Sequence, residues 1–321
     1  MRSVGGLPPA APSGPRVVLP LDGQVCPTPH GPCFVLRDIL APATIHGDRP
    51  VGALLRRAAP DAALLARDAL LAGFDPRSAL FLDLETTALA PGLGNLPFLI
   101  GIAWFQGERL VVEQWLLRDP DEEEAALSQV SQRLEEAEWL VTFNGRTFDW
   151  PLLAGRFALH HMTPPPHLGH LDLLPASRRL LRHGLPNCRL GTIEAHHLGL
   201  QRVGDVKGSQ VPAAWLEYQH GGAPHGLVGV AKHNRDDILS LVTLLDFLLA
   251  HTAEAESLVL RDPPLALAIA AAALGLDQWA RAEAIYTVAT AFPATAEAGR
   301  IGLARVARRR KRVTAGRKTT A

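Results

Sequence analysis

The 321-residue sequence predicts an α/β fold with a mixed sheet, in which an antiparallel meander is extended by parallel strands and flanked by helices. Three observations support this prediction. Three apolar, strand-like runs follow one another closely between residues 79 and 117. Two shorter apolar runs, at residues 139–143 and 170–174, alternate with helical segments. The composition, 47% hydrophobic and 20% charged, allows a substantial buried core.

The predicted meander occupies residues 79–84, 98–105 and 109–117. Gln106-Gly107-Glu108 joins its second and third strands and is typical of a tight hairpin connection. We expect Asp121 to cap the next helix, with Glu124 three residues later as its capping-box partner. Because acids in a first helical turn also suit the helix dipole, we do not interpret this acidic run as a metal site.

Apolar periodicity predicts the remaining helices. Their expected ranges are 148–160, 175–182, 189–198 and 227–251, followed by an antiparallel pair at 265–274 and 279–292. We therefore predict four parts of the chain. They are an N-terminal extension with a disordered start, short strands and helices (1–75), the α/β domain (76–252), a small C-terminal helical hairpin (253–299) that is similar to one tetratricopeptide unit, and a basic disordered tail (300–321).

The formal net charge is zero, but the charges are unevenly distributed. Residues 298–321 contain nine Lys or Arg and no acid, which leaves 23 bases against 32 acids in residues 1–297. Such a basic end is typical of a tail that binds phosphates, and a solubilising end is the alternative. The longest apolar run, 265–276, is shorter than the ~20 residues of a membrane span, and no secretory signal is found. We expect a cytoplasmic protein with no membrane partner.

The stretch Asp83-Leu84-Glu85 ends the first apolar run. Side chains two residues apart on a strand point to the same side, so Asp83 and Glu85 are expected to be neighbours. Two like charges at the end of a buried strand repel each other and resist desolvation, and a hard cation with oxygen ligands relieves both effects. The alternative is a strand that simply ends in a polar turn, because Asp-x-Glu is common by itself.

Two further acidic positions follow in chain order. Asp149 comes after the apolar run 139–143, near the start of a helix, where an N-cap role is the structural alternative. His233 and Asp237 are four residues apart on a long helix and share one face. Asp236 is offset by about 100° and is expected to face solvent. A helix-stabilising His–Asp pair is the alternative for His233 and Asp237.

Asp172 is a fourth candidate, in an apolar run that closely follows His167 and His170. No Cys or further His completes a zinc-binding spacing there, so we expect a structural or substrate-positioning role. The three cysteines of the chain are odd in number and lack a CxxC spacing. They indicate neither a disulfide framework nor a zinc site.

Together these residues resemble the motifs of the DEDD (DnaQ-like) 3′→5′ exonuclease superfamily, which has a ribonuclease H-like fold. Asp83-Leu84-Glu85-Thr86-Thr87 is similar to the first motif, the Asn-x-x-x-Phe-Asp pattern of residues 144–149 to the second, and residues 233–237 to the third. The resemblance covers roughly residues 76–250, and the ordered set is specific although each motif is weak. Within the superfamily the chain is most similar to the YprB-like group, through Gly92-Leu93-Gly94, Phe98-Leu99-Ile100-Gly101, His170-Leu171-Asp172-Leu173 and His233-Asn234.

Two positions depart from the superfamily pattern. Ala88 stands where a glycine often follows the first motif, which alters the loop expected beside the terminal nucleotide. His233 stands four residues before Asp237, which is the spacing of the tyrosine-containing subfamily, whereas the histidine-containing subfamily uses five. The role of general base therefore comes to His233 from its residue type and not from its spacing.

The resemblance implies phosphodiester hydrolysis with two divalent ions, Mg²⁺ or Mn²⁺, about 4 Å apart. Asp83 would bridge both ions, Glu85 and Asp237 would bind the ion that carries the nucleophilic water, and Asp149 would bind the other. His233 would orient or deprotonate this water, because imidazole titrates in the useful pH range. The residues implied in binding the substrate are Thr86, Thr87, Leu89 and Asn144.

We therefore expect a metal-dependent 3′→5′ exonuclease that acts on single-stranded or frayed 3′ ends of DNA or RNA. No sugar-reading motif in the sequence selects one of the two nucleic acids. Two alternatives stay open: a structure-selective endonuclease on the same fold, and a non-catalytic nucleic-acid-binding protein with a vestigial nuclease fold. The full set of carboxylates argues against the second alternative, since degenerate copies tend to lose metal ligands first.

Overall fold

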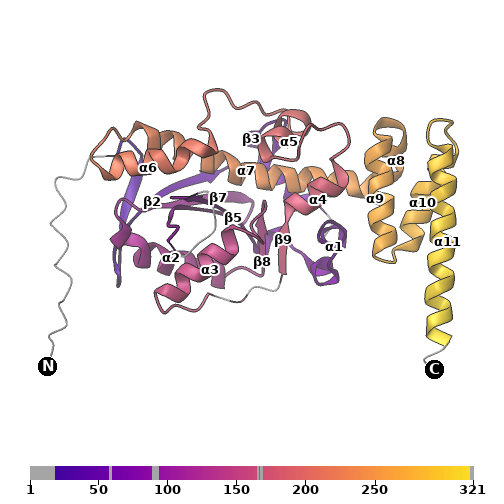
Figure 1. The fold of residues 1–321 in the computed structure, drawn as a ribbon, viewed down its shortest axis with the longest axis horizontal. Coiled ribbons are helices and arrows are strands. Elements are labelled where there is room, and N and C mark those ends of the chain that lie inside the picture. The colour runs from indigo at the N-terminus through magenta and orange to yellow at the C-terminus, as the bar shows by residue number, and fades with distance from the viewer. Residues whose placement is uncertain (1–18, 58–59, 89–93, 165, 167–168, 319–321) are drawn as a thin grey trace.

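A computed structural model describes the chain except for residues 1–18, 58–59, 89–93, 165, 167–168 and 319–321. A seven-stranded sheet forms the centre of the molecule (Figure 1). Its strands are β1 (Gly23–Thr28), β2 (Gly31–Leu40), β5 (Ala79–Thr86), β6 (Pro97–Gln106), β7 (Arg109–Leu116), β8 (Trp139–Thr142) and β9 (Gly169–Asp172). They lie side by side in the order β1-β2-β7-β6-β5-β8-β9.

The predicted mixed sheet is confirmed. Strands β5, β6 and β7 form the antiparallel meander, and β8 and β9 extend it as parallel strands from the β5 side. The N-terminal hairpin of β1 and β2 pairs antiparallel with β7 on the other side. The N-terminal extension therefore protects a sheet edge that would otherwise present unpaired backbone groups.

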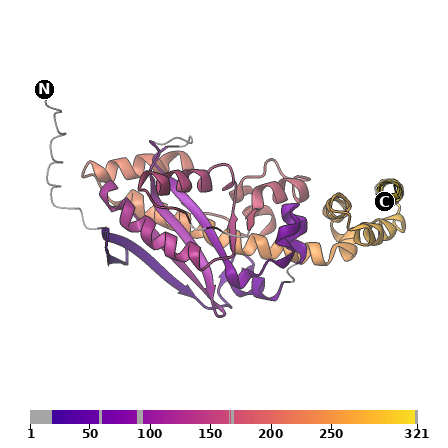
Figure 2. The same ribbon diagram turned by 90° about the horizontal axis from the view of Figure 1, so that it is seen from below.

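Helices cover both faces of this sheet. Helices α2 (Glu123–Glu135) and α3 (Asp149–Leu159) lie on one face, and α7 (His225–Ala253) crosses the other (Figures 1 and 2). The connecting elements are β3 (Ile45–His46), β4 (Arg49–Pro50), η1 (Val51–Arg56), α1 (Pro60–Ala66), η2 (Ala69–Gly73), η3 (Pro76–Ser78), η4 (Pro120–Glu122), α4 (Leu173–Leu180), α5 (Leu190–His197), η5 (Gly208–Gln210) and α6 (Val211–Gln219).

The start of α2 differs from our prediction. The side chain of Asp119, and not that of Asp121, accepts the capping hydrogen bond, from the backbone N–H of Asp121. Pro120 occupies the first position of the short turn η4, which matches its fixed φ angle. The buried Glu122 and Glu123 pair with Arg118 and Arg156, so the acidic run is structural, as expected.

Side chains of β5 alternate between two hydrophobic cores. Leu80 and Leu82 pack in the core that contains Phe157 of α3, whereas Phe81 packs in the core that contains much of α7. Because strand side chains have a period of two, Asp83 and Glu85 must follow Phe81 onto the α7 face. The alternation thus determines the face on which the acidic site forms.

A glycine allows α7 to approach the sheet closely. A Cβ atom on Gly101 of β6 would lie 2.1 Å from Asn234 Oδ1 and 2.4 Å from Ile238 Cδ1. Any larger residue would force α7 away from the sheet or distort β6. Gly101 stands directly opposite Asp83 in the β5–β6 register, so this close approach lies beside the acidic site.

The C-terminal region consists of α8 (Ala255–Arg261), α9 (Pro263–Gly275), α10 (Trp279–Thr290) and α11 (Ala296–Lys318). Helices α9 and α10 are the predicted antiparallel pair, and Ile269 and Ile285 belong to the same core as α7. No single described helix is long and apolar enough to cross a membrane; α7 and α8 meet that requirement only as a pair, which is bent by 93°.

Our prediction of a disordered basic tail was wrong for residues 300–318, which belong to α11. Two features explain the helix. Ala, Arg and Lys favour helix formation, and the buried Val306 packs in the shared core. Gly302 also lets α11 approach the Tyr286 ring of α10, because a Cβ there would lie 2.3 Å from a ring carbon.

Candidate active site

Asp83 and Glu85 lie near the carboxyl end of β5 on the face that α7 covers. Glu85 is buried and Asp83 is partly buried, with Leu84 on the opposite face. The β5–β6 register shifts between Glu85 and Thr86, and such an irregularity commonly ends regular pairing beside a functional site. The sequence prediction that the two carboxylates are neighbours on one side of the strand agrees with this geometry.

Asn234 of α7 holds Asp83 in place. Its Nδ2 donates hydrogen bonds to Asp83 Oδ2 at 2.8 Å and to the Asp83 backbone oxygen at 3.2 Å. Its Oδ1 accepts a hydrogen bond from Gln114 Nε2 at 2.8 Å. Asn234 is completely buried, so its amide position is defined by these partners. The sheet and α7 thereby fix the orientation of one carboxylate.

Asp149 is the first residue of α3 and is buried. Phe148 occupies the N-cap position and makes no side-chain cap, so the alternative that Asp149 serves as the N-cap is wrong. The preceding strand β8 runs parallel to β5, and the carboxyl ends of adjacent parallel strands meet at one sheet edge. This topology brings Asp149 to the end of β5 that carries Asp83 and Glu85.

Asp172 fixes the loop before Asp149. Its carboxylate accepts backbone hydrogen bonds from Asn144 at 2.7 Å, Arg146 at 3.2 Å and Leu174 at 3.0 Å. Asn144 has a φ angle of 69°, a left-handed conformation that Asn tolerates better than most residues. We expected either a structural or a substrate-positioning role for Asp172, and these three hydrogen bonds show a structural one.

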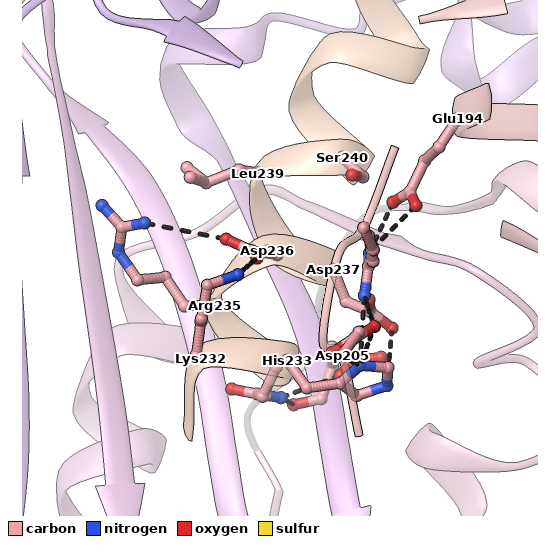
Figure 3. A network of polar contacts seen from close by, with 12 residues as sticks. Glu194, Asp205, Lys232, His233, Arg235, Asp236, Asp237, Leu239 and Ser240 are labelled. Carbon is pink, nitrogen blue, oxygen red and sulfur yellow. Dashed lines mark hydrogen bonds and ion pairs between the residues drawn. The ribbon is translucent and has the colours of Figure 1, made fainter. Parts of the chain in front are cut away.

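His233 and Asp237 lie on one face of α7, as their spacing predicts (Figure 3). His233 Nε2 is 3.9 Å from Asp237 Oδ2, and His233 Nδ1 is 2.8 Å from Asp205 Oδ2. Asp236 pairs with Lys232 at 2.5 Å on another side of the helix, and its side chain is only 14% exposed, so the expectation that it faces solvent was wrong. Asp205 therefore holds the imidazole with its Nε2 edge toward the acidic site.

Arg202 is a cation inside this acidic cluster. Its guanidinium forms an ion pair with Asp237 Oδ1, and Nη2 lies 2.5 Å from Glu194 Oε1. Nη1 lies 3.2 Å from Asp205 Oδ2. Glu194 of α5 is completely buried, and the Arg202 side chain is only 11% exposed. The buried carboxylate of Glu194 thus holds Arg202 against the predicted ligand Asp237.

Comparison with known proteins now identifies the family. The profile of the RNase_H superfamily matches residues 80–249, which is more than half of the chain. The chain belongs to the RNase_H superfamily. It is also 37% identical over 174 residues to the uncharacterized protein YprB of Bacillus subtilis (strain 168). That match spans 54% of this chain and only 42% of YprB.

A solved structure is also similar to this RNase_H superfamily member. The family B DNA polymerase from the hyperthermophilic archaeon Pyrobaculum calidifontis aligns with a TM-score of 0.43 and 17% sequence identity. The alignment covers 68% of this chain and 30% of the polymerase.

The acidic residues of this superfamily member share a strongly perturbed electrostatic environment. Burial raises the pKa of Asp83 and of Glu85 well above their ordinary values, and repulsion from Asp237 raises both further. Burial also raises the pKa of Asp149 to about 7. For Asp237, burial raises the pKa while Arg202 partly offsets the effect. Repulsion between these carboxylates thus adds to the effect of burial on the pKa values of Asp83, Glu85 and Asp149.

The four carboxylates fit a hard divalent cation by their chemistry, because such ions prefer oxygen ligands. In the described part of the chain, however, no three His, Cys, Asp or Glu side chains are arranged as a preformed metal site. Asp237 Oδ1 is buried and pairs with Arg202 without an aligned hydrogen bond. A divalent cation could therefore bind Asp237 Oδ1 only after Arg202 has moved away from this oxygen.

A cavity of about 450 Å³ opens beside Asp83 and Asp237. Asn144 lines it, together with Arg178 and Arg189, so this predicted substrate residue lies where a substrate has access. The cavity is large enough for part of a ligand and presents both acidic and basic groups at its wall.

The other predicted substrate residues have local partners. The Thr86 hydroxyl donates to the Ala88 backbone oxygen at 2.7 Å, and the Thr87 hydroxyl lies 3.2 Å from Asn95 Oδ1. Both threonines therefore stabilise the loop after β5 in the structure. Leu89 lies outside the described residues, as do Gly92, Leu93 and His167 of the sequence comparison.

Sequence reasoning missed Glu194, Arg202 and Asp205 as members of the site. Glu194 lies within the predicted helix 189–198, and the other two follow in an irregular connection before η5. Glu194 lies on a short helix, and Arg202 and Asp205 follow it without a regular spacing. No periodic pattern therefore indicates that the three residues belong to one site. The available signal was a nearby run of mixed charges, which is also common on solvated surfaces.

Proposed function

We propose that this chain is a metal-dependent nuclease of the DEDD (DnaQ-like) type, and specifically a 3′→5′ exonuclease. The observation that supports it best is the convergence of Asp83, Glu85, Asp149 and Asp237 from β5, α3 and α7. Membership of the RNase_H superfamily supports a nuclease in general terms. The proposed substrate is the 3′ end of single-stranded or frayed DNA or RNA, cut in the cytoplasm.

Hydrolysis of a phosphodiester needs an activated water and compensation for the charge on the leaving oxygen. Two bound Mg²⁺ or Mn²⁺ ions would supply both. Asp83, Glu85, Asp149 and Asp237 would hold them, with Asp83 kept in orientation by Asn234. Releasing Asp237 from Arg202 is a requirement for this arrangement.

His233 would accept the proton of the attacking water at Nε2. We assign the other ring nitrogen, Nδ1, as the protonated one that donates to Asp205, because a carboxylate can only accept. Arg202 Nη1 lies slightly farther from Nδ1, at 3.1 Å, and donates to Asp205 Oδ2 at 3.2 Å instead. Asp205 would then stabilise the imidazolium that forms when the proton is accepted.

The decisive experiment compares oligonucleotides labelled at one end. With Mg²⁺ or Mn²⁺, a 5′-labelled single strand should yield a ladder of shortening products, while a 3′-labelled strand should release labelled mononucleotide first. Parallel DNA and RNA strands identify the preferred nucleic acid. Internal cuts at defined structures would support the endonuclease alternative instead.

One observation favours the non-catalytic alternative, namely the arginine already bound to Asp237. A metal titration of the full chain separates the two proposals. Saturable Mn²⁺ binding that Asp83→Asn abolishes supports the nuclease. If Asp83→Asn changes neither Mn²⁺ binding nor cleavage of any DNA or RNA, both nuclease proposals fail.

A further inference from the structure

A second cavity lies on a neighbouring side of α4 and is more basic than the cavity beside Asp83 and Asp237. Its volume is about 630 Å³, and Arg67, Arg179 and His183 line it together with residues of α9 such as Leu267. No carboxylate is present in this lining among the described residues. We propose that this cavity binds a backbone phosphate of a single-stranded nucleic acid whose 3′ end occupies the acidic site. The inference rests on the proposed function and names a new part of its substrate path.

Arg179 provides the strongest indication that an anion belongs here. Its Nη2 donates to the Leu65 backbone oxygen, but its Nε is buried and has no hydrogen-bond partner. Burial, with repulsion from Arg67, lowers the pKa of Arg179 to about 10. Within the described residues neither arginine pairs with a carboxylate. A partly buried cation without a counterion is costly, and a phosphate oxygen would satisfy both its charge and its free N–H group.

Arg67 also occupies an unfavourable backbone position. It directly follows α1 with a φ angle of 57°, in the left-handed region where helix ends usually place glycine. The backbone N–H of the next residue, Asp68, bonds to the Ala63 oxygen, as in a common helix-ending turn. An arginine at this position is strained by comparison with glycine, and its side chain borders the cavity. A role for the side chain in binding an anion accounts for the residue type.

Helix α4 connects the two cavities directly. Leu174 and Arg178 line the acidic-site cavity, whereas Arg179 and His183 line the second one. Leu174 and Arg178 are spaced by four residues and so lie on one face of α4. Arg179 is offset from Arg178 by about 100°, and His183 follows in the turn beyond the end of the helix. The cavities therefore lie on neighbouring sides of a single helix, whose diameter is about 10 Å with side chains. A strand leaving the acidic site would meet Arg178 first and the arginine pair next.

The remaining wall favours recognition of the backbone over the bases. Its apolar part consists of proline, leucine and alanine side chains, without an aromatic ring among the described residues for a base to stack on. Two arginines read a phosphate by charge and by forked hydrogen bonds, independently of sequence. A free phosphate or a mononucleotide offers the same chemistry, so the experiment must separate a strand from a small anion.

The test uses fluorescence anisotropy with the full chain carrying Asp83→Asn, so that oligonucleotides are bound and not degraded. Labelled single strands of 2 and 16 nucleotides are titrated at several salt concentrations. Arg67→Gly removes one cation where the backbone already suits glycine, and Arg179→Gln removes the other. Arg261→Gln is the matched control, since this exposed arginine of α8 pairs with Glu254 outside the cavity.

We expect Arg67→Gly and Arg179→Gln to weaken binding of the 16-mer severalfold and to leave the dinucleotide unchanged, because a dinucleotide in the acidic site has no further phosphate to reach the second cavity. The slope of log affinity against log salt for the 16-mer should become shallower by about 0.7 for each phosphate that the variant no longer neutralises. Unchanged 16-mer binding in both variants, or an equal weakening for both lengths, would overturn the inference. So would binding of inorganic phosphate or a mononucleotide that displaces no 16-mer, because the cavity would then bind small anions only.

Failure of the second phosphate site and failure of the proposed nuclease activity give different experimental results. Cleavage by the chain with Asp83 intact, together with 16-mer binding that ignores both arginines, retains the nuclease and rejects the second phosphate site. A length-dependent weakening of binding without any cleavage retains the site and rejects the nuclease.

Discussion

The two cavities on neighbouring sides of α4 differ in their charges: the first has both carboxylates and arginines at its wall, whereas the second has only basic groups among the described residues. Around Asp83 and Asp237, buried carboxylates outnumber the cation that pairs with them, Arg202. Around Arg67 and Arg179, cations line the wall without a carboxylate among the described residues. Each cavity lacks a counter-charge, and the missing charges are a cation for the first and an anion for the second.

The comparison indicates how one fold positions a charged polymer. An acidic centre alone would repel a nucleic acid, and a basic cavity alone could bind it without reacting. Placing the two on neighbouring faces of one helix allows the strand to be held by its phosphates while its end reaches the carboxylates. The variants of Arg67 and Arg179 alter the basic cavity, and the variants that follow alter the acidic one.

The largest effect is expected from Asp83→Asn. Because Asp83 is the carboxylate that bonds to Asn234 and repels the other three, its removal should reduce cleavage by at least about 10³-fold, or about 4 kcal/mol of transition-state stabilisation. Rates on the 5′-labelled strand measure this. Asp236→Asn is the matched control, since Asp236 neighbours Asp237 but pairs with Lys232. Equal reductions in the two variants would contradict the assignment.

The next largest effect on the cleavage rate is expected for His233 and Asp205, the pair that we propose to activate the water. His233→Ala should lower kcat by about 10²-fold without abolishing Mn²⁺ binding, and Asp205→Asn should lower it by about ten- to a hundredfold. The double variant should be little slower than His233→Ala, because Asp205 acts through the imidazole. Additive effects, or an unchanged rate in His233→Ala, would show that the base lies elsewhere.

Replacing Arg202 tests whether its guanidinium competes with a metal ion for the acidic site. Arg202→Gln removes the group that competes for Asp237 Oδ1, so Mn²⁺ should bind about tenfold more tightly, or by about 1.4 kcal/mol. Calorimetric titration of the metal-free protein measures the affinity. Arg235→Gln, on the same helix as Asp237 but paired with Asp38, should leave the affinity unchanged. Weaker Mn²⁺ binding in Arg202→Gln would mean that Arg202 organises the ligands and does not compete with metal.

The smallest expected effect is on stability as a function of pH. Native Asp149 keeps its proton up to a pKa of about 7, whereas the ordinary value is 3.8. Between these values the native state binds more protons than the unfolded state, so the stability of the metal-free protein falls as pH rises through this window. Above pH 7 this contribution is constant, and below about pH 4 the penalty is absent.

Thermal unfolding of the metal-free protein at pH 4.5 and pH 8 checks this sign. Asp149→Asn should raise the Tm at pH 8 by on the order of 2–4 °C, the shift expected for about 1 kcal/mol in a domain of this size. The variant should gain little at pH 4.5, where Asp149 is already neutral. Added Mn²⁺ should raise the Tm of the unmodified chain more at pH 8 than at pH 4.5, because the ion competes with protons. A larger Mn²⁺ effect at the lower pH would contradict the prediction.

Several features followed from the sequence because they depend on local periodicity. The period of two in β5 was sufficient to place Asp83 and Glu85 on one face, and the period of 3.6 in α7 was sufficient to pair His233 with Asp237. Alternating strand and helix segments predicted the mixed sheet for the same reason. The basic C-terminal segment shows the limit, since its charge pattern suggested disorder although its composition and one buried valine, Val306, support helix α11.

The tertiary structure alone decided which charges meet. Arg202 and Asp205 lie in a connection without periodicity, so only the packing of α5 against α7 brings them to Asp237 and His233. Arg67 and Arg179 are distant in sequence and become neighbours through the packing of α1 on α4. Periodicity determines the face on which a side chain lies within its own element, whereas long-range packing determines what lies opposite, and the second depends on every element of the fold.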